Sequence, residues 1–263
     1  MIDCVSRRRT NAAVFLAFLM SAQSSLYAQS VSTARRPQEQ TIHVPFVGCK
    51  SDGQAGPLEA PHGTSKVVAI TADASRRLAY YKAEEGVGVL APRGWYCFGT
   101  YGSAGSTLYV APQPFGATEL FSDKWGGFTG PAIELNSEIG DTSGRFAVAR
   151  TIARVFPAHK AFVRNVIAEG IEPASSFPFG PYPQDKLIYR STEIVEYQTP
   201  ADKDGLGTQS YLRKNASAIK GVAILWGEEL DLLFLSARLP QELDDLTPVI
   251  IHQVESDAKH PDQ

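Results

Sequence analysis

A serine in a glycine-rich segment is the first candidate for covalent chemistry. Gly102-Ser103-Ala104-Gly105 lies between two segments rich in β-branched and aromatic residues. A nucleophilic serine needs a sharp turn and a base within hydrogen-bonding reach, and His62 or His159 could act as that base. The same glycines also provide the backbone angles of a plain hairpin turn, and the Gly-x-Ser-x-Gly sequence of a nucleophile elbow is absent. The segment favours a plain turn, with a serine hydrolase as the alternative.

The histidines form no pattern typical of a metal site. The five of them are scattered, and none stands in a His-x-His or His-Glu-x-x-His sequence. His159 falls on the apolar stripe of a predicted helix, where a histidine is more often a packing residue than a catalyst. Gly86 and Gly88 lack the remainder of a phosphate-binding loop. The sequence therefore predicts no metal and no cofactor.

Aromatic residues are the remaining candidates for ligand binding. Many of them stand in segments rich in proline and glycine, where large rings either seal the edge of the core or line a pocket for a small or sugar-like ligand. Sealing is the more common role of such rings. The residues that we consider as candidates for ligand binding are Trp95, Tyr101, Trp125, Phe179 and Tyr182.

The N-terminal residues have the three-part layout of a secretory signal peptide. Three arginines at positions 7 to 9 precede an apolar run from Ala12 to Met20, and small and polar residues follow as far as Ala28. The apolar run is about half of the roughly 20 residues that a membrane-spanning helix needs. We expect residues 1–28 to be a signal peptide and residues 29–41 a flexible leader, in a protein that is periplasmic or secreted. A buried N-terminal helix is the alternative interpretation.

Removal of this segment leaves two cysteines, Cys49 and Cys97, an even number in a compartment that permits oxidation. They are predicted to form one disulfide bond. A redox-active pair is the alternative, but such pairs usually stand close together as Cys-x-x-Cys. The formal net charge of −3, from 25 basic and 28 acidic residues among 263, indicates no nucleic-acid partner.

The elements that must position these residues indicate an α+β fold with mainly antiparallel sheet. Short segments at 95–100, 107–111, 131–135, 187–197, 208–213, 219–226 and 230–238 have the composition of strands. Thr71 or Asp73 is predicted to start a helix that ends at Gly86. Successive strands with helices gathered before and after them favour α+β over a parallel α/β sheet.

Two later helices complete the predicted fold. Apolar residues recur at three- and four-residue steps from about Gly144 to Gly170, and Pro157 predicts either a kink in this long helix or two helices in series. A final helix over about 241–257 is expected to pack on the sheet. We expect residues 42–263 to form a single globular domain, in which residues 42–135 and 144–257 could form two sub-lobes.

Residues 91–99 (Ala-Pro-Arg-Gly-Trp-Tyr-Cys-Phe-Gly) and 237–240 (Ala-Arg-Leu-Pro) carry a weak resemblance to an uncharacterised family of exported bacterial proteins. This resemblance implies export and brings no activity, ligand or catalytic residue. The sequence as a whole thus predicts a non-catalytic binding or accessory protein of the cell envelope, with a small molecule or an envelope protein as its partner. A periplasmic hydrolase that uses Ser103 with His62 or His159 is the alternative.

Overall fold

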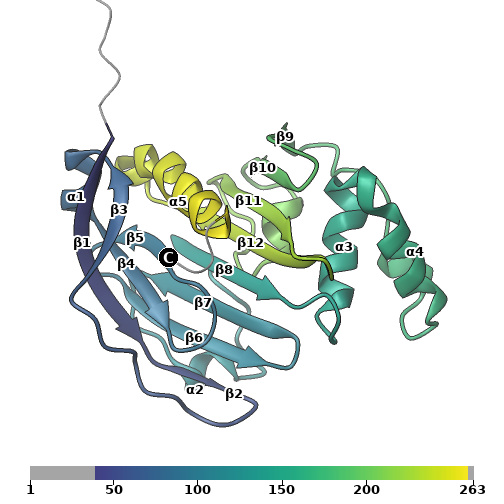
Figure 1. Ribbon diagram of the computed structural model, residues 1–263, viewed down its shortest axis with the longest axis horizontal. Coiled ribbons are helices and arrows are strands. Elements are labelled where there is room, and N and C mark those ends of the chain that lie inside the picture. Colours follow the sequence, from purple (N-terminus) through teal and green to yellow (C-terminus); the bar gives the residue numbers. More distant parts are fainter. Residues whose placement is uncertain (1–38, 260–263) are drawn as a thin grey trace, which may run out of the picture. The chain divides into compact units, whose positions relative to one another are not determined.

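The computed structural model describes residues 39–259, which form two sheets and five α-helices joined by short 3-10 turns (Figure 1). The predicted signal peptide, residues 1–28, lies outside the described residues, as does the predicted leader up to residue 38. The first strand begins at Gln40. Within residues 39–259 no helix is both long enough and apolar enough to cross a membrane.

The smaller sheet has four strands. Its order is β3 (Ser65–Ile70), β1 (Gln40–Cys49), β4 (Leu78–Ala83) and β5 (Val89–Pro92). The long strand β1 pairs antiparallel with β3 through its first half and parallel with β4 through its second half. This sheet packs over one end of the larger sheet, and its inward side chains belong to the main core.

The larger sheet has eight strands and is antiparallel apart from the pair β2 and β6. Its order is β2 (Ser51–Gly53), β6 (Tyr96–Gly102), β7 (Gly105–Ala111), β8 (Ala132–Glu138), β12 (Asp231–Arg238), β11 (Ile219–Trp226), β10 (Ile194–Thr199) and β9 (Lys186–Tyr189). Neighbours β8 and β12 come from residues far apart in the chain, with Leu135 opposite Leu235. Strands from the 42–135 range and from the 144–257 range therefore share one sheet.

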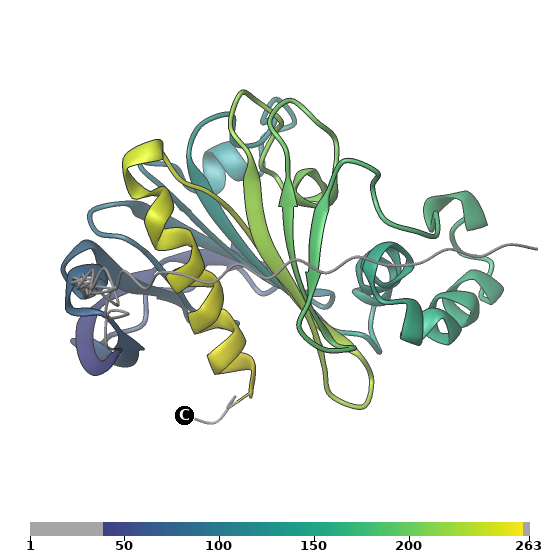
Figure 2. The same ribbon diagram turned by 90° about the horizontal axis from the view of Figure 1, so that it is seen from above.

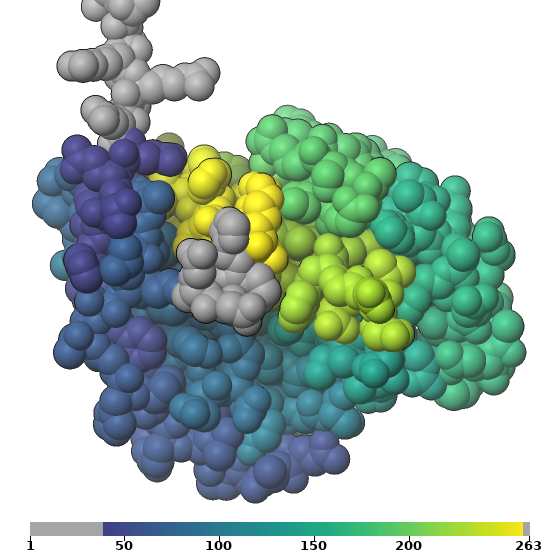
Figure 3. Space-filling model, viewed as in Figure 1, coloured from purple at the N-terminus to yellow at the C-terminus, as the bar shows by residue number. Residues whose placement is uncertain are grey.

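Helices cover both faces of this larger sheet (Figure 2). Helix α5 (Thr247–Lys259), preceded by a 3-10 turn at Gln241–Leu246, packs on the same face as the smaller sheet and contributes Ile250 and Val254 to the main core. Figure 3 shows α5 (yellow) between the N-terminal strands (purple to blue) and the green to yellow-green surface formed by residues of β9 to β12. The backbone N–H of Leu90 donates to Oε1 of Gln253 at 2.8 Å, which ties β5 to α5. The predicted C-terminal helix on the sheet is confirmed.

The opposite face carries helices α3 (Arg145–Val155) and α4 (Lys160–Ala168), with a 3-10 turn at Pro157–His159 between them. Pro157 has no N–H for a helical hydrogen bond, so the chain turns there. The structure thus has the two helices in series that the sequence allowed. Their apolar side chains form a second core with those of β10, β11 and β12. The remaining elements are α1 (Ala72–Arg77), α2 (Ala117–Leu120) and two 3-10 turns, Ala174–Ser176 and Leu206–Gln209.

The predicted disulfide bond between Cys49 and Cys97 is present, with the two Cα atoms 5.4 Å apart. Cys49 is the last residue of β1 and Cys97 lies in β6, so the bond joins the smaller sheet to the larger one. Both cysteines contact the main core. The bond therefore fixes the contact between the two sheets.

Three predicted elements were wrong. Residues 187–197 were expected to be one strand, and they belong instead to two antiparallel strands, β9 and β10. Thr71 does cap a helix and accepts a hydrogen bond from the N–H of Ala74 at 3.2 Å, but the helix ends at Arg77 and residues 78–83 are strand β4. Pairing with β1 and β5 outweighs the local helical pattern there, as tertiary contacts often do. Residues 208–213 were expected to be a strand, and they form instead the end of a 3-10 turn and an irregular segment.

Candidate functional site

The structure does not bring Ser103 together with either histidine. Ser103 lies in the exposed turn between β6 and β7, where its N–H donates to Oε1 of Gln54 at 2.9 Å and its hydroxyl is 3.5 Å from that of Ser143. Among residues 39–259 it makes no hydrogen bond to His62 or His159. The turn has the plain hairpin geometry that the glycines favour, with Gly105 at a φ of 144°.

The two histidines lie in different parts of the molecule. His62 is exposed and lines a cleft beside the smaller sheet, together with Phe46 and Lys82. His159 follows Pro157 in the turn between α3 and α4, with its Nε2 atom buried and 3.8 Å from Oε1 of Glu193. Each histidine therefore has its own surroundings, and neither is placed to activate the serine.

The five candidate aromatic residues also separate. Trp95 packs against the main core, and the hydroxyl of Tyr101 donates to the carbonyl of Gly56. Phe179 lies under the ammonium group of Lys160, and Tyr182 lies under the guanidinium of Arg154, at 4.1 Å from the ring centroid. Two of the five stand beside the cavity described next: Trp125 contacts the ring of Tyr211, and the hydroxyl of Tyr182 accepts a hydrogen bond from Nε2 of Gln209 at 3.1 Å.

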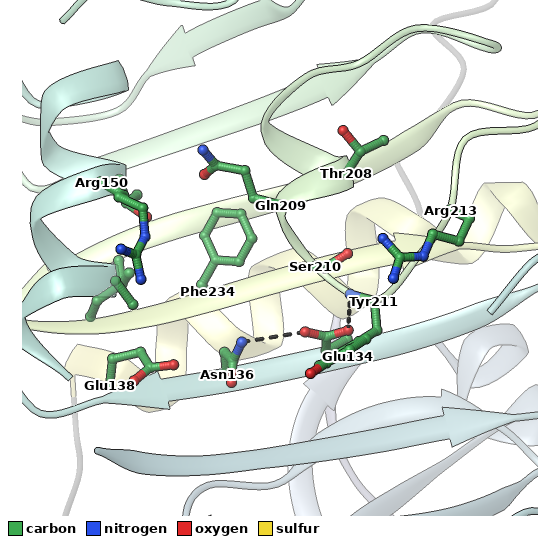
Figure 4. Close-up of a pocket in the computed structure, with 13 residues that line it drawn as sticks. Glu134, Asn136, Glu138, Arg150, Thr208, Gln209, Ser210, Tyr211, Arg213 and Phe234 are labelled. Atoms are coloured by element: carbon green, nitrogen blue, oxygen red, sulfur yellow. Dashed lines mark hydrogen bonds between the residues drawn. The ribbon is translucent and has the colours of Figure 1, made fainter. Parts of the chain in front are cut away.

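A cavity of about 500 Å³ lies on the face of the larger sheet that carries α3 and α4. It is bounded by β8, the first half of α3 and residues 208–213 (Figure 4). This volume is within the range of small-molecule sites. Its floor is apolar, formed by Leu232 and Phe234 of β12, and its walls are polar. The polar lining consists of Glu134, Asn136, Glu138, Arg150, Thr151, Thr208, Gln209, Ser210, Tyr211 and Arg213.

Three polar side chains of β8 line one wall in a row. Glu134, Asn136 and Glu138 alternate along the strand, so they share the face opposite to Ile133 and Leu135, which pack into the main core. Asn136 donates from Nδ2 to Oε1 of Glu134 at 3.3 Å, and its own Oδ1 accepts from the hydroxyl of Thr107. Asn136 thus orients Glu134.

Glu134 is a buried carboxyl group, with only 1% of its surface exposed. The backbone N–H of Tyr211 donates to its Oε2 at 2.7 Å, which favours the charged form. Burial has the larger effect and raises the pKa of Glu134 to about 8. Burial also raises the pKa of Glu138 to about 7, against the attraction of Arg150. Two carboxyl groups of one cavity therefore titrate near neutral pH, a property that is enriched at functional sites.

Two arginines stand at opposite ends of the cavity. Arg150 of α3 lies at the Glu138 end, and its Nη1 pairs with Glu172 at 2.9 Å. Arg213 lies at the Glu134 end, and its Nε donates to the carbonyl of Gly126. In the described part of the chain no carboxylate lies within ion-pairing distance of Arg213.

A third arginine, Arg238, holds the walls of the cavity without lining it. Its side chain is 2% exposed and donates to the carbonyls of Phe128, Gly130 and Arg213, which brings residues 126–130 and 211–213 onto β12. Arg93 has a similar role elsewhere, since it donates to two carbonyls of the α1–β4 segment. Residues 91–99 and 237–240 thus each contain an arginine that binds backbone carbonyls.

Behind the polar wall, aromatic rings pack against the cavity. Trp125 is 4.8 Å from Tyr211 and 5.3 Å from Phe128, between ring centroids. Tyr109 of β7 contacts all three rings, and burial together with the nearby Glu134 raises the pKa of its hydroxyl. This packing holds the Tyr211 segment in place.

Sequence reasoning missed this cavity. The alternation Ile133-Glu134-Leu135-Asn136 was the available signal, because it places polar side chains on the face opposite the core. The covering segments come from residues 125–130 and 205–213, and no local pattern shows that they meet β8. Among residues 39–259 no group of three or more histidine, cysteine or acidic residues is arranged to hold a metal ion.

Comparison with known proteins found no match among family models, curated proteins or solved structures.

Proposed function

We propose that this protein is an exported, non-catalytic binding protein of the cell envelope and that its ligand is a small polar molecule held in the cavity over β8. The observation that carries the proposal is the row of Glu134, Asn136 and Glu138 on one wall of a cavity of about 500 Å³. Hydrogen bonds hold Glu134 and Asn136 in position before any ligand arrives, which lowers the entropic cost of binding.

The lining favours a ligand with several hydroxyl groups. Planar polar side chains such as Glu138, Gln209 and Arg213 can each pair with adjacent hydroxyls, and Phe234 offers an apolar surface beneath them. Several of the other polar groups are already bonded within the protein. The hydroxyl of Ser210, for example, donates to the carbonyl of Gly207 at 2.6 Å and accepts from the N–H of Leu212.

Export is supported by the N-terminal sequence and by the disulfide bond. Disulfides persist in the periplasm and outside the cell and are rare in the cytosol. The apolar run at Ala12–Met20 and the small residues before Gln29 have the order of a signal peptide. Both features suit a binding protein that meets its ligand outside the cytoplasm.

Native mass spectrometry of protein recovered from the exported fraction tests the proposal. We expect a chain that starts near Gln29, lacks two hydrogens because of the disulfide, and carries an additional non-covalent mass. The variant Ala147→Phe places a ring in the cavity and should lose that mass, whereas the Ser103→Ala variant should keep it. A bare wild-type chain, or an adduct that Ala147→Phe retains, would contradict binding in this cavity.

A further inference from the structure

The cavity contains a cation that the protein itself does not neutralise. Arg213 is exposed at the rim, and Figure 4 shows its guanidinium turned toward the cavity on the side of Glu134. Its Nε is bonded to Gly126, but within the described residues its terminal nitrogens make no hydrogen bond. These nitrogens can therefore donate to a ligand.

The backbone of Arg213 is held on both sides. Its N–H donates to the carbonyl of Phe128 at 2.9 Å, and its carbonyl accepts from the buried Arg238. Gly127 has a φ of 94°, and a Cβ there would lie 2.9 Å from Nε of Arg213. Glycine thus leaves room for the guanidinium to lie against the 126–127 backbone. The position of this cation is set by the fold.

The carboxyl group of Glu134 does not cancel this charge at neutral pH. Arg213 lowers its pKa, but burial outweighs that attraction and keeps the pKa at about 8. The other groups around Glu134 are Glu138, whose pKa is about 7, and the hydroxyls of Tyr109 and Tyr197, whose pKa values burial raises. Below about pH 7, where both carboxyl groups hold their protons, Arg213 is consequently the charge that no neighbouring carboxylate offsets at this end of the cavity.

The other end of the cavity offers hydrogen-bonding groups. Among residues 39–259 the carboxyl of Glu138 makes no hydrogen bond, and the side-chain carbonyl of Gln209 is also without a partner. The charge of Arg150 is shared with Glu172. Hydroxyl groups of a ligand can pair with Glu138 and Gln209, above the apolar ring of Phe234.

We propose that the ligand is a sugar acid: a hydroxyl-rich ring whose carboxylate pairs with Arg213 and whose hydroxyls reach Glu138 and Gln209. This inference rests on the proposed function and names the chemical class of ligand for the same cavity. A planar carboxylate matches the parallel N–H groups of a guanidinium. The apolar face of the sugar ring lies on Phe234 and Leu232.

Isothermal titration calorimetry on the mature, oxidised chain tests this assignment with matched ligands. Glucuronate and galacturonate are compared with glucose and galactose, at pH 6.5 and constant ionic strength. We expect each uronate to bind about tenfold or more tightly than its neutral sugar, because hydrogen bonds between two charged groups are stronger than those between neutral groups. Arg213→Gln should remove this preference, and Arg213→Lys should retain part of it.

The neighbouring cation provides the matched control. Lys214 pairs with Asp204 at 2.8 Å on the surface and does not line the cavity, so Lys214→Gln removes one charge from the same segment. It should leave the preference unchanged. Equal affinities for uronates and neutral sugars, or a preference that survives in Arg213→Gln, would overturn the sugar-acid assignment. If no sugar binds but the exported protein carries a mass that Ala147→Phe removes, the assignment is wrong while the binding function stands.

Discussion

The two faces of the eight-stranded sheet are formed by the same strands, but at β8 one face is apolar and the other is polar. On one face Ile133 and Leu135 pack against the smaller sheet and α5 in a continuous apolar core. On the other face Glu134, Asn136 and Glu138 line a polar cavity beside α3. Since neighbouring residues of a strand point to opposite faces, one short stretch of β8 supplies both.

Under the proposed function, this difference separates stability from ligand binding along a single strand. Burial of Leu135 removes apolar surface from water and stabilises the fold. Burial of Glu134 places a carboxyl group where its charged form is poorly solvated, which costs stability at neutral and alkaline pH. Substitutions on each face test whether stability and ligand binding are as independent as this comparison implies.

Loss of the disulfide should have the largest effect on the unfolding free energy, and it acts on the face that packs into the main core. The two cysteines are 48 residues apart in sequence, and replacing them with Cys49→Ser and Cys97→Ser should cost at most about 4 kcal/mol of unfolding free energy. Urea unfolding of the oxidised wild type and of the double variant measures the loss. A loss below about 1 kcal/mol would mean that the core alone holds the two sheets together.

Leu135→Ala should cost about 3 kcal/mol, because the side chain is 2% exposed and a cavity would remain in the core. Affinity for a ligand of the β8 cavity should stay within about twofold at a temperature where the variant is folded. Glu138→Gln, on the opposite face, should show the reverse pattern: a small change of stability and a weakened affinity. Equal destabilisation by both substitutions would contradict the separation of the faces.

We expect Glu134 to contribute to the pH dependence of the unfolding free energy. Its pKa rises from the ordinary value of 4.5, which we take for the unfolded chain, to about 8 in the folded protein. Between these pH values the folded state binds a proton that the unfolded state has lost, so the unfolding free energy falls as pH rises through this range. Glu134→Gln removes the group, and the fall between about pH 5 and pH 9 should shrink by at most about 4 kcal/mol, since each pKa unit corresponds to about 1.4 kcal/mol.

Chemical denaturation of both proteins at a series of pH values measures this slope. The slope is the relevant quantity because the amide introduced by Glu134→Gln also changes the hydrogen bonds to Asn136 and Tyr211, which shifts stability at every pH. Glu138→Gln is the companion variant. It should reduce the fall of the unfolding free energy with pH by a smaller amount, because the pKa of Glu138 is about 7. Identical slopes in wild type and Glu134→Gln would show that Glu134 is ionised in the folded protein.

Ser103→Ala should have the smallest effect, within about 0.5 kcal/mol, because the side chain is exposed in a turn. A fluorophosphonate probe should label neither protein. Labelling of the wild type that disappears in Ser103→Ala would revive the hydrolase hypothesis and place chemistry away from the β8 cavity.

The sequence predicted the parts of this molecule that depend on local pattern. Pro157 marked the break between α3 and α4, and the residues of β11 and β12 had the composition of buried strands. The even number of cysteines in the predicted mature chain led to the Cys49–Cys97 bond. Each of these depends on residue type and on neighbours within a few positions.

The candidate site depends on contacts that no local pattern contains. Glu134 lies beside the segment of Tyr211, a residue 77 positions later in the chain, whose backbone N–H donates a hydrogen bond to the Glu134 carboxyl group. Residues 208–213 look like a strand by composition, yet Arg238 and the Trp125 ring hold them over β8. For the same reason Leu78–Ala83 has a helical pattern in the sequence and becomes a strand only through its partner β1.

The hydrogen bond between Leu90 and Gln253 has a consequence for the kinetics of folding. It joins residues 163 positions apart, and α5 supplies side chains to the main core of both sheets. Contacts between residues so far apart in sequence require a long loop to close, which costs chain entropy and slows folding. The main core therefore cannot close until α5 has been synthesised, so a chain that is still emerging from the ribosome lacks part of the core that both sheets share.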